Sequence, residues 1–268
     1  MSTEAGVGRV LLEREGGLAR LVVSNPAARG AFTEAMYAQL RDHCLALRQD
    51  ASVRLVSVTG RDGAFAAGTD VADLVWIRTG ADGVAYERHI VDVLDAVRAL
   101  RVPVLALVDG PAVGGGLAVV ACCDVVVATP ASRFGAPVAR TLGNCVSPGT
   151  TARLRASLGR ALTNELLLTG RLATAEEVRA AGLVSRVVEA DQLVAVEAEL
   201  LAAVSRCAPH AVAAAKEIGA RLDEAQLVGA GGWPVDADDV YADVYSHPDF
   251  HEGVAAFLER RRPRWSTP

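Results

Sequence analysis

The chain has 268 residues, of which 51% are apolar and 22% are charged, and its formal net charge is -5. This length and apolar content predict one globular unit with a large core, and the negative charge argues against a nucleic-acid partner. Because there is no basic N-terminal leader and no run of about 18 apolar residues, we expect no membrane association and a cytoplasmic location.

The cysteines and histidines carry no metal-binding or disulfide pattern. The five cysteines are odd in number and show no Cys-x-x-Cys spacing, so reduced thiols are expected. Cys122 and Cys123 lie side by side in an apolar run and are predicted to be small core residues. None of the five histidines forms a ligand-type pair with a cysteine, and we expect no metal site.

The first hundred residues predict alternating strands and helices. After a polar tail (1–7), residues 9–24 alternate around Gly16-Gly17, as in a two-stranded hairpin. Thr33 is the expected N-cap of an amphipathic helix over 33–48. A strand over 53–59 and a helix over 85–100 follow. The inward face of that helix is expected to be an apolar stripe of Tyr86, Ile90, Val93, Val97 and Leu100. His89 would lie at the edge of this stripe.

A glycine-rich stretch between two apolar strands stands out in residues 102–129. The strand 104–108 is followed by a turn at 109–111, then by Gly114-Gly115-Gly116 at the start of an apolar helix, then by a strand over 124–129. Three glycines at a helix start cost backbone entropy, so the bare backbone must serve a purpose. Either the helix packs closely on its strand, or free N–H groups stabilise negative charge on a carbonyl oxygen, as in an oxyanion hole.

A second donor for such an oxyanion hole is predicted upstream, in residues 63–71. This segment follows a strand and contains Ala66, Ala67 and Gly68, whose small side chains would let a ligand run along the backbone. The Thr69 N–H would then point at the ligand together with the Gly115 N–H. The glycine spacing does not match a dinucleotide-binding fingerprint.

These segments together resemble one known family. The residues that carry the likeness are Ala66-Ala67-Gly68-Thr69-Asp70-Val71, Pro103-Val104, Asp109-Gly110, Gly114-Gly115-Gly116, Cys123-Asp124, Phe134-Gly135-Ala136-Pro137 and Leu168-Thr169-Gly170. In this order and register they resemble the crotonase, or enoyl-CoA hydratase/isomerase, superfamily. The resemblance runs from about Val10 to about Trp265.

The resemblance implies an α/β fold. Residues 1–200 would form a crotonase-like spiral of β-β-α units, and residues 201–268 a helical region that covers the acyl pocket and assembles a homotrimer or a dimer of trimers. The ligand would be an acyl-CoA thioester, with no cofactor beyond the coenzyme A of the substrate. The pattern itself predicts helices over 160–168, 174–181, 194–205, 209–222 and 251–262, and a strand over 183–188.

The same resemblance implies the binding positions. The coenzyme A nucleotide would pack on the loop 25–31, where Arg29 either meets a phosphate or is simply solvated. The substrate-binding positions are Ala28, Arg29, Ala66, Gly68, Asp70, Val71, Gly114, Val138 and Thr141. In some members the helix that here spans 85–100 lends a residue to the acyl pocket, which makes His89 a candidate.

The positions of the two catalytic glutamates of the family carry no acidic side chain in this sequence. Hydratases of the family carry two glutamates, which here correspond to Ala118 and to Val138 or Ala139. Neither side chain transfers protons, and each lost acid–base group is worth about 10² to 10⁴ in rate. We therefore expect only a trace of hydratase activity and no carboxylic acid close to the reacting carbon.

The remaining polar groups leave two functions open. Catalytic roles are assigned to Arg140, which could hold an acid group, and to Asn144 and Ser147, while Thr141 could donate a hydrogen bond. Cys145 would act as a nucleophile only if its pKa were lowered, and an inert thiol is favoured. Glu165 and Glu176 are expected on the surface. The chain is then either an acyl-CoA isomerase, decarboxylase or related enzyme, or an acyl-CoA-binding protein without catalysis.

Overall fold

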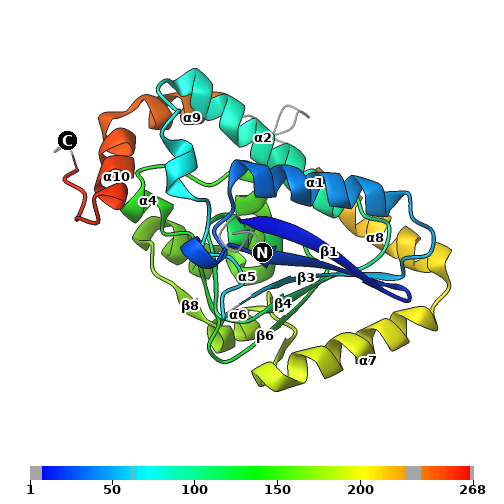
Figure 1. Cartoon of the computed structure of the whole chain (residues 1–268). Helices are drawn as coiled ribbons and strands as arrows, with labels where there is room; N and C mark the ends of the chain where they lie inside the picture. The colour runs from blue at the N-terminus through cyan, green and yellow to red at the C-terminus, as the bar shows by residue number, and fades with distance from the viewer. Residues whose placement is uncertain (1–7, 62, 227–236, 266–268) are drawn as a thin grey trace, which may run out of the picture.

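The computed structural model describes residues 8–61, 63–226 and 237–265 (Figure 1). The predicted polar tail 1–7 lies outside this part of the chain. None of the helices in the described part combines the length and the hydrophobicity that a membrane span requires.

The larger of two sheets runs in the order β1-β2-β3-β4-β6-β9. Its strands are β1 (Arg9–Glu15), β2 (Leu18–Ser24), β3 (Leu55–Gly60), β4 (Val104–Val108), β6 (Val125–Ala128) and β9 (Arg186–Val187). The predicted hairpin is confirmed, because β1 and β2 pair antiparallel from Arg9 opposite Ser24 to Glu15 opposite Leu18. The later neighbours are all parallel, as strands joined by helical crossovers must be.

The smaller sheet was not predicted. It consists of β5 (Pro111–Val113), β7 (Arg133–Gly135) and β8 (Ala173–Thr174) in that order. The predicted turn over 109–111 therefore ends in a strand, because Pro111 is the first residue of β5. Because β4 leads directly into β5, and β6 into β7, successive strands alternate between the two sheets. This alternation is the spiral of β-β-α units that the resemblance implied.

The first residues of helices α1 and α2 are set by local capping signals in the sequence. Helix α1 (Glu34–Arg48) begins where expected, because the Thr33 side chain accepts a hydrogen bond from the Met36 N–H. Helix α2 (Gly80–Arg98) begins five residues earlier than predicted. A reciprocal capping box between Thr79 and Asp82 fixes this earlier start. Helix α3 (Gly115–Val120) begins at the second of the three glycines.

The middle of the chain is more helical than predicted. Helix α4 (Val138–Thr141) is a single turn, and α5 (Pro148–Thr169) extends twelve residues before the predicted start at Arg160. Gly159, with φ of +72°, breaks α5 where the predicted helix was expected to begin. Helix α6 (Ala175–Ala181) has the expected Thr174–Glu177 capping box.

The C-terminal helices return to both sides of the sheet. Helix α7 (Leu193–Ser205) lies on the face of the large sheet opposite α1 (Figure 1), over Leu18, Leu55 and Leu105. Helix α8 (Pro209–Gln226) follows it. Helix α9 (Asp238–Ser246) was not predicted, and α10 (Pro248–Leu258) begins three residues before the predicted start.

A second apolar cluster brings the end of the chain back to its beginning. Tyr241 and Tyr245 of α9 and Phe250 of α10 pack with Val71 and Leu74, which belong to a short 3-10 helix, η2 (Val71–Leu74). Helix α9 lies along α2 (Figure 1) at very close range. A Cβ added at Gly83 of α2 would lie 2.3 Å from the Tyr245 ring. The C-terminal helices therefore form one wall beside α2.

Candidate active site

The two glycine-rich segments lie side by side. The Ala66 N–H donates to the Pro111 carbonyl at 2.9 Å, and the Val113 N–H donates to the Ala66 carbonyl at 3.0 Å. A Cβ added at Gly114 would lie 3.6 Å from the Gly68 Cα. Backbone pairing thus places Thr69 and Gly115 beside one another, as the sequence predicted.

The amides of Thr69 and Gly115 have no partner within the described residues. Their neighbours do: the Asp70 N–H donates to the Phe32 carbonyl at 2.8 Å, and the Gly114 N–H donates to the Gly135 carbonyl at 2.9 Å. A backbone N–H without an acceptor is uncommon in a protein interior. These two amides are therefore available to a ligand.

The three glycines have different surroundings, and close packing accounts for Gly116. A Cβ at Gly116 would lie 2.5 Å from the Ala66 carbonyl oxygen, which shows close packing of α3 on the neighbouring segment. Gly114 has φ of +52°, a conformation that L side chains rarely adopt. A Cβ at Gly115 would lie 2.1 Å from the Tyr37 hydroxyl, inside the site itself.

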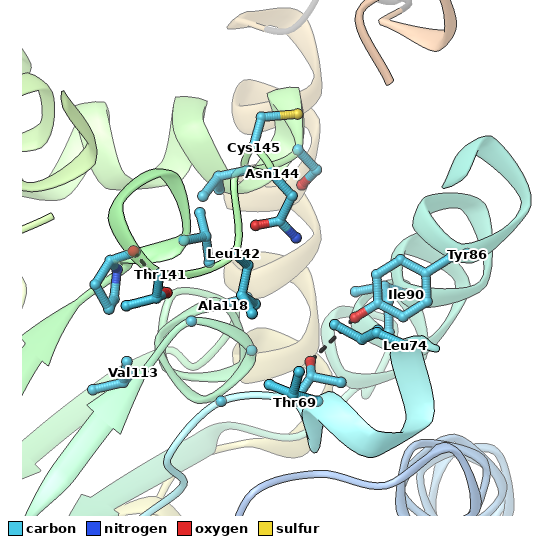
Figure 2. Close-up of a pocket in the computed structure, with 18 of the residues that line it drawn as sticks. Thr69, Leu74, Tyr86, Ile90, Val113, Ala118, Thr141, Leu142, Asn144 and Cys145 are labelled. Atoms are coloured by element: carbon cyan, nitrogen blue, oxygen red, sulfur yellow. Dashed lines mark hydrogen bonds between the residues drawn. The ribbon is translucent and has the colours of Figure 1, made fainter. Parts of the chain in front are cut away.

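A cavity of about 240 Å³ opens between these segments, α2, α4, the start of α5 and α10. Figure 2 shows Thr69, Tyr86 and Ile90 on one side of it and Ala118, Thr141 and Leu142 on the other. The predicted site residues that line it are Gly68, Thr69, Val71, Gly114, Gly115, Val138, Thr141, Asn144 and Ser147. Those that do not are Ala28, Arg29, Ala66, Asp70 and Arg140.

The polar residues predicted after the Phe-Gly-x-Pro motif are mostly engaged elsewhere. Arg140 is exposed and lies beside Gly170, so its position gives no support to the role of holding an acid group in the cavity. Ser147 caps α5 by accepting from the Thr150 N–H, and Thr141 donates to the Pro137 carbonyl. Asn144 is 9% exposed and reaches the cavity wall.

The predicted nucleotide loop borders the first glycine-rich segment from outside the cavity. The Ala67 N–H donates to the Arg29 carbonyl at 3.2 Å, which ties the loop to the backbone beside Gly68. Asp70 instead caps η2 by accepting from the Ala72 N–H. Ala66 is fully buried in the backbone pairing described above.

Three hydroxyl groups form a chain at the cavity wall. The Thr69 hydroxyl lies 2.8 Å from the Tyr37 hydroxyl and 3.1 Å from that of Tyr86, the contact drawn as a dashed line in Figure 2. Burial raises the pKa of both tyrosines, so they stay protonated at neutral pH. This chain fixes the Thr69 side chain and the rings that frame its amide.

The expectation of no carboxylic acid near the site is wrong. Glu87 of α2 lines the cavity and is only 6% exposed. Its Oε1 accepts a hydrogen bond from the Tyr245 hydroxyl at 2.6 Å. Burial raises the pKa of Glu87 to about 7, although the Tyr245 hydrogen bond opposes this shift. A buried carboxyl group with a raised pKa is thus present in the cavity.

Two other candidates have no reactive setting. Burial raises the pKa of the Cys145 thiol to about 12, which supports the inert interpretation. His89 does not line the cavity, and its buried Nε2 finds no partner among the described residues. The residue that α2 contributes to the cavity beside Tyr86 and Ile90 is Glu87, two positions before His89.

Comparison with known proteins identifies the family. The family model for enoyl-CoA hydratase/isomerase matches residues 13–268. The chain is 31% identical to the 2,3-dehydroadipyl-CoA hydratase of Escherichia coli over 265 residues, covering 96% of this chain and 98% of that protein. It is 32% identical to an enoyl-CoA hydratase/carnithine racemase from Magnetospirillum magneticum, with a TM-score of 0.76 and coverage of 96% and 95% of the two chains.

A further solved structure supports the fold. A methylmalonyl-CoA decarboxylase in complex with 2-nitronate-propionyl-CoA superposes with a TM-score of 0.85 at 22% identity, covering 97% of this chain and 99% of that one. The matches span nearly all of the chain, so the predicted crotonase-type fold is confirmed. The chain belongs to the enoyl-CoA hydratase/isomerase family.

Proposed function

We propose that this protein binds an acyl-CoA thioester and stabilises the enolate formed from it. The thioester oxygen would accept hydrogen bonds from the N–H groups of Thr69 and Gly115. The observation that carries this proposal is the pair of unpartnered amides, held side by side at the edge of a largely apolar cavity. Amides fixed in advance stabilise developing negative charge at little cost in reorganisation.

The reaction is one other than hydration by a glutamate pair. Ala118 and Val138, the positions at which the resemblance places the hydratase glutamates, both line the cavity with apolar side chains. The relatives named above are described as acting on CoA thioesters, and this substrate class is what we transfer to the chain. Isomerisation and decarboxylation both pass through an enolate without adding water, so either would use the two amides.

Purified protein should bind CoA thioesters and hydrate crotonyl-CoA poorly. We expect a panel of straight, branched, malonyl-type and aromatic thioesters to show binding by calorimetry, with crotonyl-CoA hydration slower than about 1 s⁻¹. Faster hydration would contradict the role assigned to the missing glutamates. Tight binding without turnover of any thioester would favour an acyl-CoA-binding protein that lacks catalysis.

We further propose that residues 201–268 take part in a homotrimer or a dimer of trimers. Ile218 and Leu222 of α8 are one helical turn apart and are 60% and 61% exposed, so they form an exposed apolar pair on one face of the helix, which supports this proposal. Replacing both with aspartate should convert the assembly to monomers in light-scattering measurements. An unchanged mass would place the contact elsewhere, and a monomeric parent protein would contradict the assembly itself.

A further inference from the structure

We propose that Glu87 is the proton-transferring carboxyl group of this cavity, removing a proton from the carbon next to the thioester carbonyl and returning it. This inference rests on the proposed function, because the enolate formed when the proton leaves needs the Thr69 and Gly115 amides. It assigns the chemistry to α2, and not to the two positions at which hydratase glutamates are expected.

The geometry of Glu87 is that of an oriented group with one free oxygen. Oε1 accepts from the Tyr245 hydroxyl at 2.6 Å, and that hydroxyl in turn accepts from Asn144 Nδ2 at 3.2 Å. No described residue donates a hydrogen bond to Oε2. The Tyr245 phenol, itself held by the Asn144 amide, thus anchors Oε1 and leaves the second oxygen for the substrate.

The surroundings of Glu87 favour proton transfer over ion pairing. The polar groups that face Glu87 across or along the cavity wall come from several elements. They are Tyr37 of α1, Tyr86 of α2, Thr69 beside η2, Asn144 and Cys145 of the loop after α4, and Tyr245 of α9. The lining contains no lysine, arginine or histidine among the described residues. Without a cation to hold the charged form, burial keeps protonated and ionised states close in energy.

The proposed step is balanced without any cofactor. The Glu87 carboxylate takes the proton, the C–H electron pair forms a double bond to the thioester carbon, and the carbonyl π pair moves to the oxygen, giving an enolate hydrogen-bonded to the two amides. Return of the proton to the same carbon regenerates the substrate. In a 3-enoyl thioester, return of that proton two carbons further along shifts the double bond into conjugation with the carbonyl. One carboxyl group therefore suffices for an isomerisation.

The alternative is that Glu87 only anchors α9 through Tyr245. Substitution by glutamine separates the two roles, because the amide oxygen of Glu87→Gln still accepts from the Tyr245 hydroxyl while the group cannot take a proton from carbon. The probe is butyryl-CoA in deuterium oxide, with deuterium entry at the carbon next to the thioester followed by NMR and affinity followed by calorimetry.

The wild type should exchange this proton, and Glu87→Gln should exchange it at least about 100-fold more slowly with affinity changed less than about threefold. Equal exchange rates would overturn the role of Glu87. Binding without exchange in the wild type would overturn it as well, while leaving the binding function in place. Absence of binding in the wild type would instead overturn the proposed function.

Tyr245 supplies a second test through pH. Because Glu87 acts as a base when ionised, exchange should rise as pH increases through about 7. The Tyr245 hydrogen bond stabilises the ionised form, so Tyr245→Phe should move this rise to higher pH. A purely structural Tyr245 would change stability and leave the midpoint of the profile where it is, and an unmoved midpoint would refute the positioning role.

Discussion

Gly115→Ala is expected to slow deuterium exchange of an acyl-CoA about 100-fold or more. The added Cβ would lie 2.1 Å from the Tyr37 hydroxyl. Tyr37 cannot move aside easily, because it is buried and its ring stacks on Phe32 with centroids 4.8 Å apart. The backbone must shift instead, which displaces the Gly115 amide. Loss of one such donor costs about 10² to 10³ in other enzymes. The measurement is the exchange rate at saturating ligand.

Two further variants identify the cause of this loss. Apart from the hydroxyl, the nearest atoms to the added Cβ are 3.4 Å away, so Tyr37→Phe in the Gly115→Ala background should recover the part of the rate lost through displacement of the Gly115 amide. The Thr69 hydroxyl keeps its contact with Tyr86 in that variant. Gly219→Ala on α8, where an added Cβ meets nothing within 4 Å, should leave exchange unchanged. Wild-type exchange by Gly115→Ala alone would show that the amide position is unimportant.

Gly110→Ala is expected to lower the free energy of unfolding by about 3 to 4 kcal/mol. Gly110 has φ of +79°, which costs about 1 to 2 kcal/mol with a side chain. The new Cβ would also lie 1.9 Å from the Gly63 carbonyl oxygen, and such overpacking adds about 1 to 3 kcal/mol. Urea unfolding followed by circular dichroism measures the loss.

Gly16→Ala is the matched control for this prediction. Gly16 lies in the β1–β2 turn with φ of +57°, but an added Cβ there meets nothing within 4 Å. It should therefore show only the conformational cost of about 1 to 2 kcal/mol. Equal losses in the two variants would show that close packing between the glycine-rich segments contributes nothing to stability.

Elements with strong local signals were predictable from the sequence. The hairpin around Gly16-Gly17, helix α1 behind Thr33 and helix α6 behind its capping box all begin where the sequence indicates, because turn and cap residues act within one or two turns of chain. Strand β4 also matches its predicted bounds, since an apolar β-branched run between turn residues has few alternatives.

Elements defined by distant partners were not predictable. Strands β5, β7 and β8 have only two or three residues each, too few to show a period, and they exist because backbone groups from separate units meet. Helix α9 is stabilised by packing on α2, where Gly83 contacts the ring of Tyr245. Because this contact is distant in sequence, the residues of α9 alone do not predict a helix there.

The candidate site divides in the same way. Thr69 and Gly115 could be located because unusual glycines point to a functional backbone, whereas a lone glutamate on a helix is normally solvated. Glu87 nevertheless had a signal in the sequence: it lies three residues before Ile90 and seven before Leu94, on the buried stripe of α2. Arg140 is close to the site only along the sequence, and the single turn of α4 leaves it exposed.

The most direct test of the account is the infrared carbonyl stretch of a thioester labelled with carbon-13 at the carbonyl, recorded free and bound. Two hydrogen bonds from the Thr69 and Gly115 amides would polarise this carbonyl and move the band to lower frequency, with a smaller displacement in Gly115→Ala. A band at the same frequency in the bound and free ligand would contradict the proposed binding of the thioester oxygen.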